Sequence, residues 1–229
     1  MYWKEYNSNL EALSKSLLKH NKGGSFNYVE DSFYNHVRDI VAIEIANLIT
    51  LVEEKVRVID YGSNLTSWSN IQNKIDTKRL HVDIYDPFAK KNCEDLTKTL
   101  NFTCKKYSDL DSIQSNEYDL SLFGSVLQYI DDFYEIFLNN PVLRSRKIIF
   151  THTPLSMSEE IVSKQFSDFK GNQKIYSYKD ILEIMSEFGF HCIFRSTLDP
   201  KYAMPEKKFL KRIIYGNLIF SSENKAHNK

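Results

Sequence analysis

The spacing of hydrophobic residues changes near residue 54. Before that point apolar residues recur at helical spacing, and we expect a weak helix over residues 10–20 and a stronger one over 31–52. The apolar stripe of the second helix consists of Val41, Ile45, Leu48 and Val52. From residue 55 onward, short β-branched or apolar runs alternate with helical segments. The pattern therefore predicts an N-terminal helical extension (1–54) and an α/β domain (55–229).

Seven short runs in the second part are typical of β-strands. They cover residues 55–59, 80–85, 102–107, 119–124, 147–150, 192–195 and 213–220. Helical segments separate the earlier strands, which predicts a parallel sheet with helices on both faces. The last two strands lie close together after a helix, which indicates an antiparallel edge. We expect a Rossmann-like α/β sandwich with a mostly parallel seven-stranded sheet and an antiparallel C-terminal edge, plus the N-terminal helices.

Small polar residues mark the expected helix starts. The expected N-caps are Thr66 or Ser67, Asp131 or Asp132, and Ser177. Gly189 lies where the last of these helices should end. The polar stretch over residues 156–174 carries no expected element.

Composition narrows the class of protein. The 229 residues include 30 Lys or Arg and 30 Asp or Glu, so no net field attracts nucleic acid or an anionic membrane. The three cysteines, Cys93, Cys104 and Cys192, are widely spaced, which argues against disulfides and fits a reducing compartment. No apolar run approaches the roughly 20 residues of a membrane helix, and no signal-peptide core is present. We expect a cytoplasmic protein that neither binds nucleic acid nor spans a membrane.

The first expected strand leads into the turn Asp60-Tyr-Gly-Ser-Asn-Leu-Thr-Ser. Open α/β sheets bind ligands at the carboxyl ends of their strands, and Gly62 would let the backbone approach a ligand closely. A carboxylate beside this turn would repel a pyrophosphate, but Asp60 could accept hydrogen bonds from the cationic amino-acid end of S-adenosylmethionine, directly or through water. The alternative is a plain strand-to-helix turn.

The ends of the next strands add further candidate ligands of this cofactor. Asp86 follows the second strand and could accept both ribose hydroxyls, or it could only begin an Asp-Pro turn. The loop after the third strand could hold the adenine, or it could be an ordinary solvated loop. The complete expected cofactor set is Asp60, Gly62, Ser63, Asn64, Asp86, Pro87, Ser108, Asp109, Gly124, Ser125 and Leu127.

Three segments resemble one family more specifically. Residues 60–74 resemble Asp-Phe-Gly-Gly-x-Leu-Gly-Ser followed by an aromatic and a Gln-Asn segment. Residues 118–132 resemble Asp-x-x-x-x-Ser-x-Leu-Gln-Tyr-x-x-Asp, with Ser-x-Leu-Gln-Tyr as the most specific part. Residues 147–155 resemble a strand that leads into Arg-Thr-Pro. The family is a group of bacterial class I methyltransferases often found near surface-polysaccharide biosynthesis genes, and the resemblance covers roughly residues 55–195.

The resemblance implies a class I methyltransferase fold, S-adenosylmethionine at Asp60, Gly62, Asp86 and Ser125, and a cell-surface glycan or its precursor as context. The sequence departs from the family at three positions. Ser63 and Thr66 stand where glycine is usual, and His152 stands where arginine is usual. Asn64 and Thr66 also replace two glycines of the common Asp-x-Gly-x-Gly-x-Gly turn, although Asn tolerates a positive φ.

Methyl transfer requires an aligned nucleophile and, for a hydroxyl or amine, a base. His152 is the candidate base, because it ends the fifth expected strand and an unperturbed imidazole titrates near neutrality. The alternative is a hydrogen-bonded structural histidine. Gln128 and Tyr129 are expected to orient the acceptor, or to pack in the core. The other histidines lack metal-ligand spacing, so we expect no metal.

Three hypotheses remain open at this point. The first is an S-adenosylmethionine-dependent methyltransferase acting on a small molecule or glycan precursor. The second is a non-catalytic cofactor-binding or scaffold protein on the same fold, and the third is a nucleotide-sugar or NAD enzyme. A basic run of Lys207, Lys208, Lys211 and Arg212 could meet a phosphate or form a solvated face. The N-terminal helices could cap the site or mediate dimerisation.

Overall fold

The computed structural model describes residues 32–62, 65–87, 100–113, 117–164, 172–198 and 212–222. Several sequence-based expectations lie outside these ranges: the helix over residues 10–20, Ser63, Asn64, Cys93 and the lysines of the basic run.

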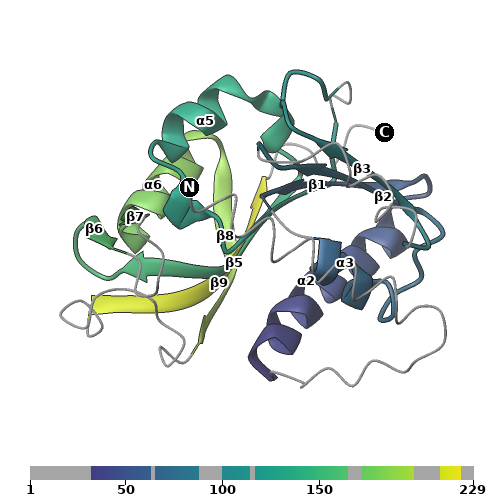
Figure 1. Cartoon of the computed structure of the whole chain (residues 1–229), viewed down its shortest axis with the longest axis horizontal. Coiled ribbons are helices and arrows are strands. Elements are labelled where there is room, and N and C mark those ends of the chain that lie inside the picture. The colour runs from purple at the N-terminus through teal and green to yellow at the C-terminus, as the bar shows by residue number, and fades with distance from the viewer. Residues whose placement is uncertain are drawn as a thin grey trace.

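A seven-stranded sheet forms the centre of the molecule, in the order β3-β2-β1-β4-β5-β9-β8 (Figure 1). Its strands are β1 (Val56–Tyr61), β2 (Leu80–Tyr85), β3 (Thr103–Tyr107), β4 (Leu120–Gly124), β5 (Lys147–Ser156), β8 (Phe190–Leu198) and β9 (Ile213–Ser222). The strands from β3 to β5 pair in parallel, whereas β9 is antiparallel to both β5 and β8. The predicted mostly parallel sheet with an antiparallel C-terminal edge is confirmed.

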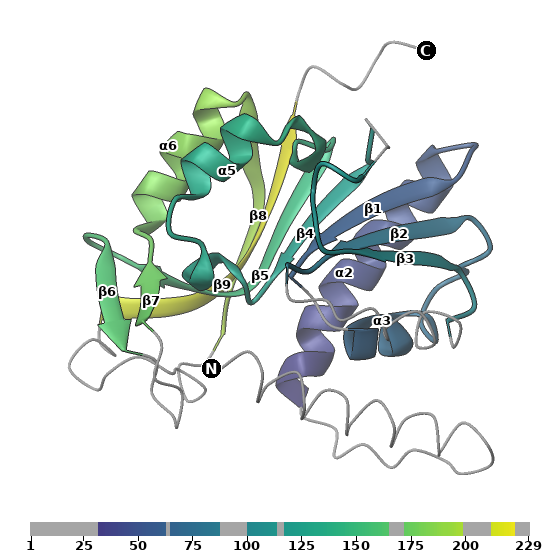
Figure 2. The same ribbon diagram turned by 45° about the horizontal axis from the view of Figure 1, so that its top comes forward.

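Helices cover both faces of this sheet. Figure 2 shows α2 (Ser32–Leu51) and α3 (Leu65–Ile71) on one face, and α5 (Phe133–Asn139) and α6 (Tyr178–Glu187) on the other. Val41, Ile45 and Leu48 of the predicted stripe are buried in one cluster with Val56 and Val58 of β1. Because α2 shares a hydrophobic core with the sheet, its position is fixed against the strands that end at the candidate site.

The helix caps follow the sequence at two of the three starts. Asp132 accepts the Glu135 amide at 3.0 Å, and the Ser177 hydroxyl accepts the Asp180 amide at 3.0 Å, as predicted. Gly189 has a φ of +80° just beyond α6, which a glycine adopts without strain. The expectation that Thr66 or Ser67 caps α3 was wrong, since α3 begins at Leu65 and both residues lie in its first turn.

A small hairpin occupies the stretch for which the sequence predicted no element. It pairs β6 (Ile161–Lys164) with β7 (Asn172–Ile175) in antiparallel register, with Ser163 opposite Gln173. Each of its two strands buries one apolar and one polar side chain: Ile161 and Ser163 on β6, and Ile175 and Gln173 on β7. The sequence therefore lacks the regular alternation of hydrophobic and polar residues by which a strand is recognised. Both figures place the hairpin beside the extended end of β5, which continues to Ser156 instead of ending at Phe150.

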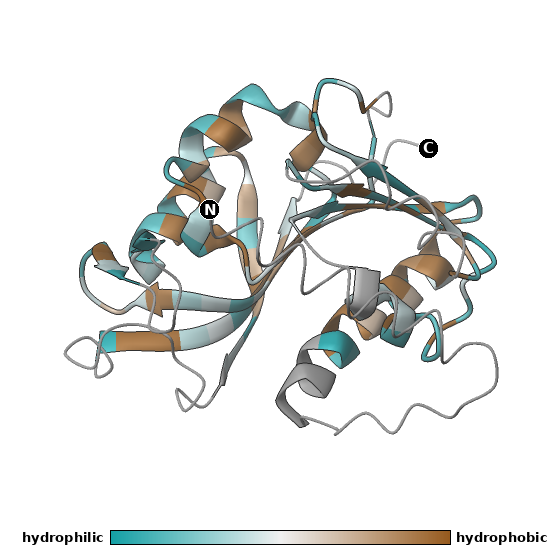
Figure 3. Ribbon diagram, in the orientation of Figure 1, coloured by the Kyte–Doolittle hydropathy of each residue, from teal (hydrophilic) through white to brown (hydrophobic). Residues whose placement is uncertain are grey.

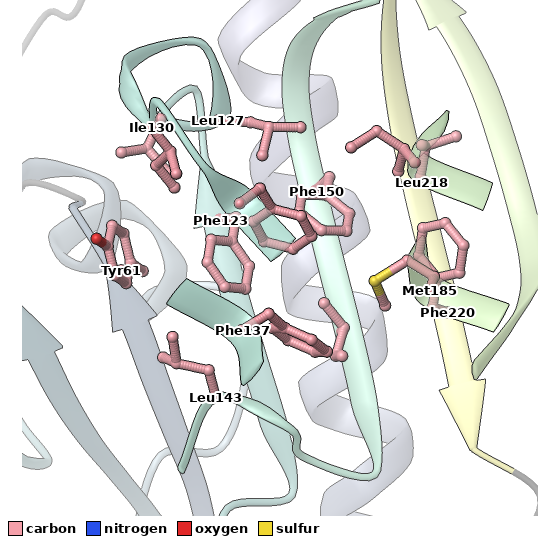
Figure 4. Close-up of a cluster of buried hydrophobic side chains, with 14 of the residues drawn as sticks. Tyr61, Phe123, Leu127, Ile130, Phe137, Leu143, Phe150, Met185, Leu218 and Phe220 are labelled. Carbon is pink, nitrogen blue, oxygen red and sulfur yellow. The ribbon is translucent and has the colours of Figure 1, made fainter. Parts of the chain in front are cut away.

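Aromatic rings fill the core between the sheet and α5 (Figure 4). Phe123 and Phe150 stack with centroids 5.1 Å apart, and Phe133 meets Phe123 edge-on at 5.7 Å. Figure 3 shows hydrophobic residues along the central strands and along the helices. Offset and edge-to-face pairs of this kind each add about 0.5–1.5 kcal/mol beyond simple burial, and they hold the end of β4 rigid.

Candidate functional site

The chain order of the strands reverses between β1 and β4, which makes the carboxyl edge of the sheet the expected place for a ligand. The ends of β1, β2 and β3 are level, because Tyr61 pairs with Tyr85 and Tyr85 with Tyr107. The amide of Gly62 donates to Tyr85 O at 2.7 Å, and the amide of Asp86 donates to Tyr107 O at 2.8 Å. The predicted residues at these three strand ends therefore follow one another along a single edge.

Gly62 requires the absence of a side chain. Its φ is +80°, and a Cβ placed on it would lie 2.6 Å from Cγ2 of Val126. Gly62 is itself exposed, so its backbone is open to a ligand at the edge of the sheet. Gly62 is therefore confined by Val126 on one side and open to a ligand on the other, which fits the prediction that the backbone allows a close approach here.

The carboxylate of Asp60 faces the helix that follows the turn and is hidden from solvent. Its side chain is 0% exposed, and its Oδ2 accepts a hydrogen bond from Nε1 of Trp68 at 2.5 Å. Trp68 is equally buried, so the bond ties the end of β1 to the helix that follows the turn. The carboxylate is thus directed at α3, and it stabilises the turn from beneath. A buried indole N–H normally needs a hydrogen-bond partner, and Asp60 supplies it here.

Asp86 ends β2 with a carboxylate held by a lysine. Nζ of Lys106, on β3, lies 2.8 Å from its Oδ2, and both side chains are about 15% exposed or less. The ion pair fixes the orientation of the carboxylate at the end of β2. The sequence had not paired these residues, because the pairing depends on the register between β2 and β3.

The loop after β3 brings a second carboxylate to this region. Burial raises the pKa of Tyr85, and the nearby charges of Asp109 and Asp86 raise it further. Asp109 accepts the amide of Asp111 at 3.2 Å, so its carboxylate organises its own turn. Pro87 and Ser108 are exposed beside these residues.

Ser125 and His152 meet at the ends of β4 and β5. Oγ of Ser125 lies 2.5 Å from Nδ1 of His152, and the Ser125 amide donates to Thr151 O at 2.9 Å. Both residues have positive φ, +56° and +48°, which is uncommon outside glycine and clusters at functional sites. Burial lowers the pKa of His152 to about 4, so the imidazole is neutral at pH 7.

Asn217, on β9, holds the backbone of His152 in this conformation. Its Oδ1 accepts the His152 amide at 2.9 Å, and its Nδ2 donates to Oγ of Ser196 at 2.9 Å. Asn217 is 0% exposed, and the imidazole rests against the ring of Tyr215 with centroids 4.9 Å apart. The sequence analysis missed Asn217, although an asparagine inside the apolar strand 213–220 is a signal of a buried polar contact.

The short turn η2 (Leu127–Tyr129) follows Ser125 directly. Leu127 is 1% exposed and belongs to the core, whereas Tyr129 is partly exposed. Gln128 is 8% exposed, and its Nε2 donates to the carbonyl of Ser125 at 2.9 Å. Gly124, half-buried at the end of β4, lies beside Thr151. The structure therefore brings the predicted catalytic residues His152, Gln128 and Tyr129 to one corner of the sheet around Ser125.

Within the described ranges, no three His, Cys, Asp or Glu side chains are grouped closely enough to hold a metal ion. None of the helices in the described part of the chain has both the length and the apolar character needed to cross a bilayer.

Comparison with known proteins identifies the fold. No protein-family model matches the sequence, and no curated protein sequence matches it significantly. The structure is similar to 1,6-didemethyltoxoflavin-N1-methyltransferase from Burkholderia thailandensis, with S-adenosylhomocysteine bound, at a TM-score of 0.59, 10% identity and coverage of 97% of this chain and 91% of that one. It is also similar to magnesium protoporphyrin IX methyltransferase from Synechocystis PCC 6803, at a TM-score of 0.56, 12% identity and coverage of 97% and 100%. The chain has the Rossmann-like fold of S-adenosylmethionine-dependent methyltransferases.

Proposed function

We propose that the protein transfers a methyl group from S-adenosylmethionine to a small-molecule or glycan-precursor acceptor. The observation that carries this proposal is the antiparallel strand β9 between β5 and β8, in a sheet whose switch point gathers Gly62, Asp86 and Ser125. The usual dinucleotide-binding sheet is parallel throughout, so this topology favours methyl transfer over an NAD enzyme.

Two residues at the edge of the sheet fit the proposed cofactor directly. Gly62 is exposed with a positive φ and leaves its backbone open to the amino-acid end. The carboxylate of Asp86, oriented by Lys106, suits ribose hydroxyls. The other residues that the sequence assigned to the cofactor lie in the adjoining loops and at the end of β4: Pro87, Ser108, Asp109, Gly124 and Leu127. Their contacts with the cofactor, and those of Ser63 and Asn64, are part of the proposal.

The role proposed for Asp60 is indirect. Because Oδ2 is bonded to Trp68 and the side chain is buried, this carboxylate acts on the cofactor mainly through the turn that it supports and through its negative charge. A buried charge a few ångströms beneath the turn still attracts a cationic amino group, since the low-dielectric interior screens it weakly.

The bound cofactor would supply an electrophilic methyl group on a sulfonium that is already a good leaving group. Tyr129 and Gln128 would then orient the acceptor next to Ser125. As the acceptor hydroxyl loses its proton to Oγ of Ser125, the Ser125 proton moves to Nδ1 of His152, which leaves an imidazolium. The low pKa of His152 makes it a weak base, so alignment supplies most of the catalysis.

The surface-polysaccharide context rests on the resemblance of three sequence segments, and we propose it as the biological setting. A second candidate function is that of a non-catalytic binding protein on the same fold. The observation that favours it is the burial of His152, which places the imidazole behind Ser125 and lowers its basicity.

Calorimetric titration with S-adenosylhomocysteine and, separately, with NADH tests the proposal. We expect saturable binding of S-adenosylhomocysteine and none of NADH. Absence of S-adenosylhomocysteine binding at millimolar concentration would overturn the proposal, and specific binding of NADH would restore the oxidoreductase reading. Incubation with methyl-labelled S-adenosylmethionine and a panel of nucleotide-activated sugars then separates the two candidates, because only the enzyme releases labelled product.

A further inference from the structure

Two buried glutamines near the candidate site each have a polar atom without a protein partner. Gln128 uses its Nε2 on the carbonyl of Ser125, but its Oε1 is buried and accepts no hydrogen bond from the described residues. Native proteins rarely leave a buried polar atom in this state unless a ligand or water completes it. This oxygen can therefore accept a hydrogen bond from a bound ligand.

Gln173 presents the complementary atom. It is 2% exposed and lies on the inward face of β7, opposite Ser163. Its Nε2 is buried and finds no acceptor among the residues that the structure describes. The hydroxyl of Ser163 donates to the carbonyl of Lys164 at 2.9 Å, and its oxygen does not accept a hydrogen bond from Gln173 Nε2.

The two glutamines stand on elements that pack against each other. β7 lies against η2, and the strand is fixed there by Nζ of Lys174 on Asp131 O and by the hydroxyl of Tyr176 on Ile130 O, both at 2.8 Å. These two bonds hold the segment after Gln173 against the segment that follows η2.

The hairpin also reaches the proposed catalytic pair. Ile161 and Ile175 share a buried cluster with Tyr215, whose ring rests against His152. The two glutamines thus lie on the same side of the candidate site as Ser125 and His152. The proposed cofactor residues of β1 and β2 lie on the other side.

The chemistry of the two atoms specifies what they would bind. A hydroxyl group donates one hydrogen bond and accepts others, so it can satisfy an amide oxygen and an amide N–H together. Neither glutamine carries a charge, and the nearby ammonium of Lys174 is already engaged by Glu160 at 3.0 Å. An anionic group would gain little here and would lose its hydration.

We infer that Gln128 and Gln173 form a subsite for a neutral, hydroxyl-bearing acceptor such as a sugar ring, which donates to Gln128 Oε1 and accepts from Gln173 Nε2. This inference rests on the proposed function and deepens it, because it names the class of acceptor. It also gives the hairpin a role: β7 supplies one half of the acceptor site and η2 supplies the other.

Nuclear magnetic resonance on the full-length, ¹⁵N-labelled protein tests the subsite without relying on catalysis. The protein, with and without S-adenosylhomocysteine, is titrated with methyl β-D-glucopyranoside, N-acetylglucosamine and glycerol, and with tetrahydropyran as a hydroxyl-free control. We expect the side-chain amide signals of Gln128 and Gln173 to shift with at least one hydroxyl-bearing probe and not with tetrahydropyran. Silence of both amides with all three hydroxyl-bearing probes overturns the inference.

Matched variants separate binding from folding. Gln128→Met and Gln173→Met keep the side-chain volume, and each should weaken binding of the active probe about tenfold, as expected when a buried hydroxyl loses one partner. Asn172→Met changes the exposed neighbour on the opposite face of β7 and should leave the affinity within about twofold. Unchanged probe affinity in both glutamine variants contradicts the subsite.

Two readouts keep this inference distinct from the proposed function and from a simpler structure. If S-adenosylhomocysteine does not bind but the amides respond to a sugar, the proposed function fails and the subsite stands. If S-adenosylhomocysteine binds and the amides are silent, the reverse holds. If the two Met variants are strongly coupled in the melting temperature of the ligand-free protein, the glutamines bond to each other and the subsite is refuted.

Discussion

Nε1 of Trp68 donates a hydrogen bond to Oδ2 of Asp60 over 2.5 Å, between two side chains that solvent does not reach. The bond joins Asp60, near the end of β1, to the helix α3. In the sequence between Asp60 and Trp68, Asn64 and Thr66 replace two glycines of the common methyltransferase pattern. The side chain of α3 thus supports the turn from beneath.

Loss of this bond should destabilise the protein. Trp68→Phe removes the donor and leaves a buried carboxylate with one fewer partner, which we expect to lower the free energy of unfolding by about 2–3 kcal/mol. Equilibrium unfolding in urea, followed by far-ultraviolet circular dichroism, measures the change. Asp60→Asn is the control: its amide oxygen can still accept from Trp68, so the loss should be smaller than for Trp68→Phe, and equal losses would contradict the account.

Gly62 should tolerate alanine less well than Gly189 does. Both have a φ of +80°, but a Cβ on Gly62 would meet Val126 at 2.6 Å, whereas one on Gly189 has no neighbour within 4 Å. Gly189→Ala should therefore cost only the backbone strain, about 1 kcal/mol, and Gly62→Ala the strain plus a steric clash. Thermal and urea unfolding of the two variants compare them directly, and a Gly62→Ala protein as stable as Gly189→Ala would refute the close approach.

The half-buried His152 makes stability depend on pH in a defined window. Burial lowers its pKa from 6.5 to about 4, so between these values the unfolded chain binds more protons than the folded one. Stability should therefore be constant with respect to this group above pH 6.5 and fall as the pH decreases toward 4, by up to about 3 kcal/mol.

Urea unfolding of the wild type and of His152→Asn between pH 4.5 and 7.5 measures this effect. Asparagine tolerates the left-handed conformation and does not titrate, so the variant should show a shallower slope. Asp83 acts at lower pH. Burial would raise its pKa, but hydrogen bonds from His81 and Tyr118 outweigh burial and lower it, so its contribution is lost only in more acidic solution. Identical slopes in the two proteins would show that His152 titrates normally.

Most of the fold could be predicted because its signals are local. Apolar runs and helical stripes located the seven strands of the central sheet and the helices α2, α5 and α6, and single polar residues such as Asp132 and Ser177 located helix starts. The hairpin of β6 and β7 was missed because Ser163 and Gln173 occupy inward positions that a strand pattern expects to be apolar. The second half of β5 was missed because its strand conformation depends on pairing with β9, far along the chain.

In the candidate site, too, the residues with local sequence signals could be predicted, whereas those brought in by strand pairing could not. The residues at the strand ends, such as Gly62, Asp86 and Ser125, could be predicted because parallel strands end at one edge. The residues that bond to these strand ends could not be predicted. Asn217 reaches His152 only through the β5–β9 register, and Lys106 reaches Asp86 only through the β2–β3 register. Burial, which determines the pKa of His152, is likewise a property of the packed structure.

The affinity for S-adenosylhomocysteine of Asp86→Asn, compared with wild type and with Asp111→Asn, tests the central claim most directly. Asp86 lies at the end of β2 with its carboxylate oriented by Lys106, whereas Asp111 is exposed in the loop after β3. Loss of a charge-assisted bond to the ribose should weaken binding about tenfold to a hundredfold in Asp86→Asn, and Asp111→Asn should bind like the wild type. Equal affinity in all three proteins, or no binding to any of them, would contradict a methyltransferase cofactor site at this edge of the sheet.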